Sequence, residues 1–436
     1  MDPDKTKPSK NPFSQRFGDL RPVIKEICKI TGVPGASIGV FHGGEVFEQH
    51  FGYSDAEIRL RPTSKTLFGI GSLTKSFVAA AIGGLVTKGE LRWRDRVTGI
   101  LDEFRHEDVT IGDLLSHRTG LSNSLSLTFQ GDGDLLLEQD QLFDMVNNLR
   151  KAEPIRSEWI YNNWGYAIAG KVVEKITKKS LDEYLGETFF RPLGLHSTTT
   201  RPDFESTENI AKAYSSLEDG SFYPLEYRQQ FTGTFFEPAG GAYSNIEDLL
   251  KWGRAFMDAI KFSPLSETSP LNQALMLLSN HVAIQTPSLL ERSYGLGWAR
   301  TQLPGVVGLI GDNNEIMPLE ELPTLGKGCE SRLVAYHQGS TVGYYSALYL
   351  DLKTESVVVV LTNSMAIGDG ADWISQAVLQ EVIGCSQPVD FVAMASQTKD
   401  ALIGHYRALS ETYALCRRDS TAQLSLSLYA GKYVAE

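Results

Sequence analysis

Ser72 and Lys75 combine a nucleophile and a base at a spacing that suits one turn of helix. Gly71 ends a short β-prone run, and a long apolar helical pattern follows from Leu73 to Lys88. We expect Ser72 to lie at the first turn of this helix, where backbone N–H groups without intrahelical acceptors favour negative charge. Lys75 then reaches the serine hydroxyl and can take its proton once burial lowers the lysine pKa.

Two similar motifs elsewhere do not fit catalysis. Ser396-Gln397-Thr398-Lys399 repeats the spacing but falls within a polar amphipathic segment, residues 390–413, and is interpreted as a solvated helix face. Gly35-Ala36-Ser37-Ile38-Gly39 matches the G-x-S-x-G nucleophile elbow, which requires a strand before the serine and a helix after it. Here Ser37 falls inside a strand, and a hairpin follows at His42-Gly43-Gly44. For Ser72 itself, the alternative is an ordinary serine cap on a buried helix.

Tyr161 and Asn163 form a second candidate group, directly before a helix that begins at Trp164. A phenol with a pKa near 10 can carry protons if neighbouring cations lower that pKa. The asparagine amide can hold both a lysine and a substrate carbonyl. The alternative is an interface tyrosine whose hydroxyl bonds to the backbone.

A third group, His337, Gly339 and Ser340, lies where a predicted strand ends. The glycine lets a ligand approach the strand edge closely. The backbone N–H of Ser340 can then pair with that of Ser72 as an oxyanion hole. The alternative for His337 is a structural histidine with satisfied hydrogen bonds.

Aromatic residues beside these motifs favour a pocket for a small, largely apolar molecule, with membership of the core as the alternative. The candidates are Phe129, Trp164, Phe235 and Tyr344. Two long segments without clear periodicity, residues 122–140 and 304–330, are expected to be loops that decide substrate choice.

The elements that position these residues alternate between strands and helices. Apolar alternation predicts a hairpin over residues 36–51, a strand at 294–298 and an antiparallel meander over 332–362. Helical patterns are predicted at residues 19–31, 73–88, 141–149, 166–176, 181–189, 245–259 and 372–383. The predicted organisation is a disordered N-terminus (1–18), a discontinuous α/β sheet domain (19–92 and 240–385), a mostly helical domain (93–239), and a C-terminal helix with a short strand-like tail (386–436).

The composition of the chain limits the kinds of partner that it is expected to bind. The chain of 436 residues has 41 Lys and Arg against 53 Asp and Glu, a net charge of −12, without a dense basic cluster. This argues against nucleic acid and anionic membranes as partners. Four scattered cysteines, with no C-x-x-C pair, predict neither a zinc site nor a disulfide framework and suit a cytoplasmic protein. No signal peptide or membrane-spanning run is evident.

Together, the order Ser72-x-x-Lys75, Tyr161-x-Asn163 and His337-x-Gly339 resembles the serine β-lactamase and penicillin-binding-protein superfamily, closest to its class C β-lactamase and esterase branch. The likeness covers residues 19 to 385. Supporting segments are Val33-Pro34-Gly35-Ala36, Leu114-Leu115-Ser116-His117-Arg118-Thr119-Gly120-Leu121 and Ala239-Gly240-Gly241.

The resemblance implies an antiparallel sheet flanked by helices, an inserted helical domain and a site between them. It implies that Ser72 is acylated, that Lys75 and Tyr161 share the proton transfers, and that Asn163 orients the substrate. His337 and Gly339 stand where true β-lactamases carry Lys-Thr-Gly, so the cation that receives a β-lactam carboxylate is replaced by a mostly neutral histidine.

We therefore expect a serine hydrolase acting on an ester, lactone or amide, with no metal or organic cofactor. One alternative is an acyltransferase that uses the same acyl-enzyme. Another is a non-catalytic small-molecule binding protein with the same fold. The sequence leaves the oligomeric state and the natural substrate open.

Overall fold

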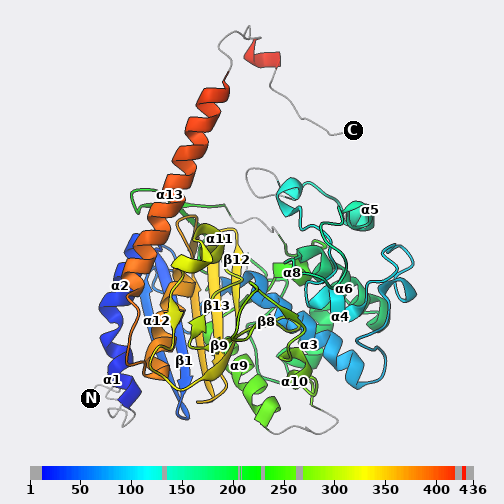
Figure 1. Cartoon of the computed structure of the whole chain (residues 1–436), viewed down its shortest axis with the longest axis horizontal. Coiled ribbons are helices and arrows are strands. Elements are labelled where there is room, and N and C mark those ends of the chain that lie inside the picture. Colours follow the sequence, from blue (N-terminus) through cyan, green and yellow to red (C-terminus); the bar gives the residue numbers. More distant parts are fainter. Residues whose placement is uncertain are drawn as a thin grey trace.

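A large antiparallel sheet and a group of helices beside it make up the computed structural model (Figure 1). The structure describes residues 12–129, 135–204, 207, 209–226, 231–261, 269–417 and 425–428. Within them, the strand order of the large sheet is β2-β1-β14-β13-β12-β9-β8-β7. These strands are β1 (Gly35–His42), β2 (Glu45–Gly52), β7 (Val282–Ala283), β8 (Arg292–Tyr294), β9 (Ala299–Leu303), β12 (Arg332–Thr341), β13 (Tyr344–Asp351) and β14 (Ser356–Thr362). The predicted α/β class with an antiparallel sheet is confirmed.

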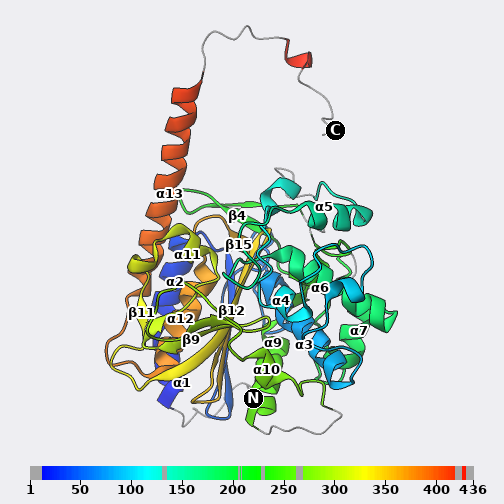
Figure 2. The ribbon, with the colours of Figure 1, turned by 45° about the vertical axis from the view of Figure 1, so that its right-hand side comes forward.

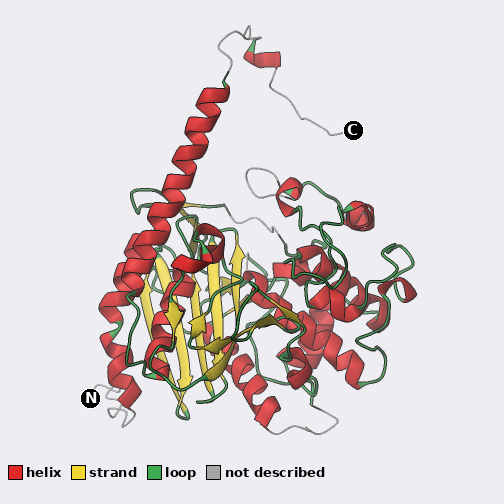
Figure 3. Ribbon diagram, in the orientation of Figure 1, coloured by secondary structure: helices red, strands yellow, loops and turns green. Residues whose placement is uncertain are grey.

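The centre of the sheet is apolar on both faces, which explains the unbroken valine run of β14. Val357, Val359 and Leu361 belong to one core cluster, whereas Val358 and Val360 belong to a second cluster on the opposite face. Successive residues of a strand point to opposite faces, so a run without polar breaks indicates helices on both sides. Those helices are α9 (Ile246–Lys261) on one face and α2 (Arg21–Ile30) with α12 (Gly370–Ile383) on the other (Figure 3).

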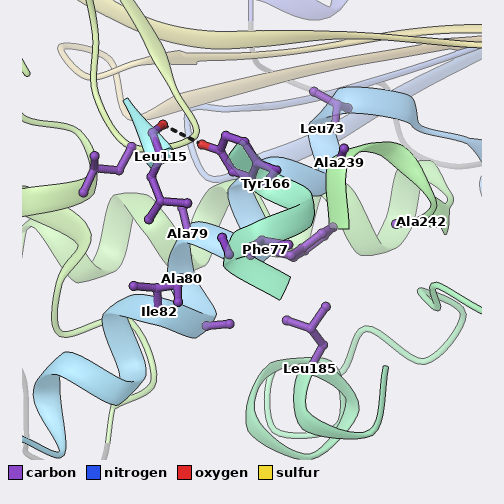
Figure 4. Close-up of a cluster of buried hydrophobic side chains, with 14 of the residues drawn as sticks. Leu73, Phe77, Ala79, Ala80, Ile82, Leu115, Tyr166, Leu185, Ala239 and Ala242 are labelled. Carbon is purple, nitrogen blue, oxygen red and sulfur yellow. Dashed lines mark hydrogen bonds between the residues drawn. The ribbon is translucent and has the colours of Figure 1, made fainter. Parts of the chain in front are cut away.

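Helix α3 (Thr74–Thr87) runs through the centre of the helical side. It is buried along almost its whole length, as expected for a helix that is apolar all round. Phe77 and Leu185 lie in the cluster around it, where the Tyr166 hydroxyl donates a hydrogen bond of 2.8 Å to the Leu115 carbonyl (Figure 4). The helices α6 (Asn163–Thr177), α7 (Leu181–Leu185) and α8 (Glu237–Gly240) contact α3, and α4 (Ile111–Leu115) packs on α6. The division into sheet and helical domains at the boundaries given above stays a prediction.

Shorter elements complete the body. The helices are α5 (Leu142–Asn148), α10 (Ala274–Leu277) and α11 (Asp312–Ile316). The strands are β3 (Phe68–Gly69) with β6 (Tyr243–Ser244), β10 (Gly305–Val306) with β11 (Thr324–Leu325), and β15 (Ser364–Met365) with β4 (Tyr214–Ser216) and β5 (Phe222–Pro224). No helix in the described part of the chain is both long and apolar enough to span a bilayer.

Both ends of the chain differ from expectation. The prediction of disorder over residues 1–18 is wrong from Pro12 onward, because α1 (Pro12–Asp19) buries Phe13 and Phe17 against the sheet domain. Residues 1–11 lie outside the described part. Helix α13 (Phe391–Cys416) confirms the predicted C-terminal helix and projects from the body (Figure 2). Of the strand-like tail, the structure describes only residues 425–428, which form a short 3-10 turn rather than a strand.

The strand predicted over residues 294–298 is wrong beyond its first residue. Tyr294 ends β8, whereas residues 295–298 form the turn between β8 and β9, with Gly297 at φ +78°. A Cβ at this glycine would lie 2.8 Å from the Lys75 carbonyl oxygen, so the turn packs directly on α3. The apolar residues that suggested a strand are therefore explained by packing of the turn against α3.

Candidate active site

Ser72 lies in η1 (Gly71–Leu73), a single 3-10 turn between β3 and α3. Gly71 has φ +47°, and a Cβ there would lie 2.7 Å from the Ser340 nitrogen, so only glycine fits. A Cβ at Gly339 would likewise lie 2.1 Å from the Ile70 carbonyl oxygen. These two glycines let η1 and β12 approach closely and place Ser72 beside Ser340. Gly339 thus accommodates the chain's own backbone, where the sequence had suggested a ligand.

Lys75 is fully buried and points back at Ser72. Its Nζ lies 2.9 Å from the Ser72 Oγ, 2.8 Å from the Asn163 Oδ1 and 2.7 Å from the Ala239 carbonyl oxygen. Burial lowers its pKa well below the ordinary value, because a desolvated ammonium is unfavourable. The predicted proximity of Ser72, Lys75 and Asn163 is present in the structure.

Tyr161 lies on the same site, with its ring 4.8 Å from the Lys75 Nζ. Burial raises the pKa of its phenol, and the negative charges of Asp312 and Glu315 raise it further, against a hydrogen bond to Ser72 that lowers it. The condition given for Tyr161 as a proton carrier, that nearby cations lower its pKa, is therefore not met. Tyr161 stays a neutral phenol at physiological pH.

Tyr161 and Asn163 lie at the N-terminal end of α6, which hydrogen bonds hold in position. The Asn162 side chain caps the helix by accepting from the Gly165 N–H, and its amide donates to the Leu121 carbonyl oxygen. The Asn163 N–H donates to the Asn123 Oδ1 at 3.1 Å. The residue pair is thus fixed between the 117–123 loop and α3.

His337 lies on β12, buried, between two partners. Its Nε2 lies 2.9 Å from the Tyr294 hydroxyl, and its Nδ1 lies 2.5 Å from the Gln338 carbonyl oxygen. Burial, assisted by the nearby Lys75 charge, lowers the pKa of His337 to about 3. A carbonyl can only accept, so the Nδ1 carries the proton and the Nε2 accepts from Tyr294. This histidine supplies no positive charge to the site.

A cavity of 340 Å³ opens at Ser72. Its wall includes Tyr161, Asn163, Gly339 and Ser340, and both predicted loops contribute to it. From the first loop come Asn123 and Leu125, and from the second Leu309, Ile310, Gly311, Asp312, Asn314 and Glu315. The 304–330 segment is therefore a wall of the site, folded around the short helix α11.

The four aromatics proposed as pocket residues do not line this cavity. Trp164 is 1% exposed and packs on Phe235, while its indole donates to the Asn123 carbonyl oxygen. Phe129 packs on Phe231, and the Tyr344 hydroxyl donates to the Ala211 carbonyl oxygen. The aromatic residues beside the motifs therefore pack in the structure around the site. Trp159 is the aromatic residue that lines the cavity together with Tyr161.

His117 was named only as part of a motif, yet it is central to the site. It is buried at φ +59°, its ring centroid lies 4.4 Å from that of Tyr161, and its Nδ1 accepts from the Asn162 N–H. Burial lowers its pKa well below the ordinary value, and the charge of Lys75 lowers it further. Sequence offered one signal for it, a histidine inside a Gly- and Arg-punctuated turn.

An ion-pair cluster around the buried Asp113 holds the two loops that carry His117 and Tyr161. Asp113 on α4 accepts from the Arg118 Nε at 2.8 Å and from the Arg156 Nη2 at 2.6 Å. Burial acts to raise the pKa of Asp113, but hydrogen bonds from Arg156 and Thr110 outweigh it and lower the pKa. No sequence pattern indicated this pairing, since its members are up to 43 residues apart.

The two rejected motifs lie away from the cavity. Ser37 is buried within β1 and lies 3.0 Å from the His50 Nδ1. The Ser396 hydroxyl donates to the Val392 carbonyl of its own helix α13. Both predictions against catalysis agree with these positions.

A family model described as Beta-lactamase matches residues 20–380, so the chain belongs to the beta-lactamase family. Among curated proteins, it is 30% identical to an unguisins hydrolase, ungD', of Aspergillus campestris, over 69% of this chain and 57% of that protein. It is 29% identical to penicillin-binding protein 4 of Amycolatopsis lactamdurans, over 74% of this chain and 86% of the relative. The match thus spans little more than half of the first relative.

Solved structures support the same fold. The octameric penicillin-binding protein homologue from Pyrococcus abyssi aligns with a TM-score of 0.67 at 22% identity, over 85% of this chain and 78% of that chain. A class C beta-lactamase aligns with a TM-score of 0.67 at 19% identity, over 87% of this chain and 99% of its own.

Proposed function

We propose that this chain is a serine hydrolase that cleaves an ester, lactone or amide of a small molecule through an acyl-enzyme on Ser72. The observation that carries the proposal is the buried Lys75 amine, 2.9 Å from the Ser72 hydroxyl at the mouth of a cavity. A serine becomes a good nucleophile only when a neighbour removes its proton. A lysine with a lowered pKa does this at neutral pH.

The hydrogen bonds of Lys75 support its action as a base. A neutral amine has two N–H donors and one lone pair. The Asn163 Oδ1 and the Ala239 carbonyl oxygen can only accept, so they take the two N–H groups. The lone pair is left to face Ser72, whose O–H then donates to Lys75.

In the proposed cycle, the Ser72 Oγ attacks the substrate carbonyl carbon while its proton passes to the Lys75 Nζ. The oxyanion is stabilised by the backbone N–H groups of Ser72 and Ser340, which close contact between η1 and β12 brings together. Tyr161 donates its phenolic proton to the leaving oxygen or nitrogen and regains one from the Lys75 ammonium. Water then attacks the acyl group, gives its proton to Lys75, and the collapse returns a proton to Ser72 as the acid leaves.

The neutral His337 sets this site apart from an efficient β-lactamase. It brings no cation to the place where the Lys-Thr-Gly lysine of β-lactamases would stand. We propose weak or absent turnover of β-lactam antibiotics for that reason. The name of the unguisins hydrolase relative supports hydrolysis as the class of reaction.

Acyl transfer to an alcohol or amine uses every residue named above and differs only in which nucleophile attacks the acyl-enzyme. A thioester donor offered with candidate acceptors separates the two, because a transferase yields the acylated acceptor and a hydrolase yields only acid. A binding protein with the same fold would form no acyl-enzyme at all. The cytoplasmic location and the absence of nucleic-acid partners stay predictions.

The test is active-site labelling. Treatment with a fluorophosphonate and intact-mass spectrometry should give a single adduct that maps to Ser72 and is lost in Ser72→Ala. Ser396→Ala, in the second S-x-x-K motif, is the matched control and should label and hydrolyse p-nitrophenyl esters like the native sequence. Nitrocefin should be turned over poorly. Unchanged ester turnover in Ser72→Ala would overturn the proposal.

A further inference from the structure

Two carboxylates face the cavity at Ser72 from the short helix α11. Asp312 and Glu315 both line the wall, together with Asp369 at the start of α12, and none of the lining residues is a lysine, arginine or histidine. The negative charges of Asp312 and Glu315 reach the reacting centre, since both raise the pKa of the Tyr161 phenol. Desolvation raises the pKa of both α11 carboxyl groups, and the charge of Asp312 raises that of Glu315 further. The wall of the cavity therefore carries acidic side chains and no basic ones.

No cation compensates these carboxylates within the described residues. Asp312 accepts from the Tyr345 hydroxyl at 2.8 Å and from the Ser340 hydroxyl at 3.3 Å, but forms no ion pair. Glu315 has no hydrogen-bond partner or ion pair among the described residues. Gln338, which lines the same cavity and is 3% exposed, leaves its Oε1 without a donor in the described part of the chain. Asp312 is partly buried, whereas Glu315 is exposed in the cavity wall. A partly buried carboxylate such as Asp312 is costly without a counter-charge, and a bound cation relieves that cost.

The chemistry of the wall favours an organic cation. No group of three or more His, Cys, Asp or Glu residues in the described chain could hold a metal ion. The carboxylates lie beside apolar side chains instead, with Leu309, Ile310 and Trp159 in the same wall. Such a surface suits an alkyl chain that ends in an ammonium group, which donates hydrogen bonds to carboxylates and is attracted to an indole face.

We infer that the substrate is an ester, lactone or amide that carries a positively charged nitrogen, received between Asp312 and Glu315. The inference rests on the proposed function, because it uses the same cavity. It assigns α11 the task of selecting substrates by charge. An anionic group in this position is repelled by both carboxylates, which adds a second reason for poor β-lactam turnover.

The test compares three acyl groups of similar length and different charge. These are p-nitrophenyl 6-aminohexanoate, which is cationic, p-nitrophenyl heptanoate, which is its neutral isostere, and mono-p-nitrophenyl adipate, which is anionic. We expect kcat/KM for the cation to exceed that for the neutral ester about tenfold or more, with the anion lowest. Acetylthiocholine, which is cationic, and 3,3-dimethylbutyl thioacetate, which is neutral, make the same comparison with the charge on the leaving group. The inference requires a preference for the cation in at least one of the two sets.

Variants assign the preference to its residues. Glu315→Gln should reduce the ratio of cationic to neutral kcat/KM about three- to fivefold, and Asp312→Asn with Glu315→Gln should bring it close to one. Turnover of the neutral ester should persist in both. Glu321→Gln, an exposed change on the same segment outside the cavity wall, is the matched control and should leave the ratio unchanged.

The inference and the proposed function fail in different ways. Turnover of all esters without a cation preference, or a preference that survives in the double variant, overturns the inference and leaves the hydrolase standing. No labelling at Ser72 overturns the hydrolase. In that case, titration of Ser72→Ala with 6-aminohexanamide and with heptanamide still decides the inference, because only a cation-selective cavity binds the first more tightly and loses that preference with Glu315→Gln.

Discussion

Replacing Lys75 by methionine tests the protonation state of the proposed base without any substrate. Burial lowers the pKa of Lys75 well below its ordinary value of 10.5. At pH values between the two, the folded chain holds a neutral amine and the unfolded chain an ammonium. The unfolded state then binds one more proton, so the free energy of unfolding of the native sequence rises with pH relative to Lys75→Met. The expected slope is about 1.4 kcal/mol per pH unit.

Between pH 7 and 9.5, the range of the assay, only Lys75 contributes to this change of the free energy of unfolding with pH. The variant leaves the Asn163 Oδ1 and the Ala239 carbonyl without their donor, at about 1–3 kcal/mol each, but that cost does not depend on pH. His117 and His337 titrate below neutral pH because their pKa values are lowered. Tyr161 titrates above the window because its pKa is raised. Below the lowered pKa of Lys75, both states are protonated and the difference becomes constant.

The assay is urea unfolding followed by tryptophan fluorescence at pH values from 7 to 9.5. The difference between the native sequence and Lys75→Met should grow by the slope given above. Lys399→Met, in the second S-x-x-K motif on α13, is the matched control, and its difference should stay flat. A flat difference for Lys75→Met would show that Lys75 is charged in the folded protein, and the proposed base would be refuted.

Other substitutions probe the remaining groups of the site. Tyr161→Phe should lower kcat/KM for esters about 10²- to 10⁴-fold without changing the unfolding midpoint much; undiminished turnover would remove Tyr161 from the proton transfers. Gly339→Ala places a Cβ 2.1 Å from the Ile70 carbonyl oxygen and should lower kcat about 10²- to 10³-fold by displacing the oxyanion hole, which a normal rate of fluorophosphonate labelling would contradict. Asp113→Ala should cost about 1–3 kcal/mol of unfolding free energy at pH 7, because the partners of Asp113 are partly exposed. Since its pKa is lowered, the difference from the native sequence should shrink as pH falls below about 4, and a pH-independent difference would argue against the ion pair.

The elements that carry the site could be predicted from periodicity alone. The apolar run of β14 and the uniformly apolar α3 are local patterns, and both elements form where they were expected. The order of the three motifs was enough to indicate the family, because it resembles the order of the motifs in known members. Sequence patterns could predict these elements because the residues that share a buried face recur along the chain at the spacing of a helix or a strand.

The electrostatics of the site could not be predicted in the same way. Burial, assisted by Lys75, lowers the pKa of His337 and keeps it neutral. Burial also raises the pKa of Tyr161, and Asp312 and Glu315 raise it further, so that Tyr161 keeps its proton. None of these partners is near in sequence to the group it affects. A pKa depends on desolvation and on charges a few ångströms away, and only the folded chain sets those distances.

The sequence by itself therefore determined which residue types are available for chemistry, a serine and a lysine one helical turn apart, and which elements present them. Tertiary structure alone decided which side chains line the cavity, moving the predicted aromatics into the core and bringing the carboxylates of α11 to the wall. The physical reason is that helix and strand patterns arise from contacts between near neighbours, whereas a cavity is bounded by segments that only long-range packing brings together.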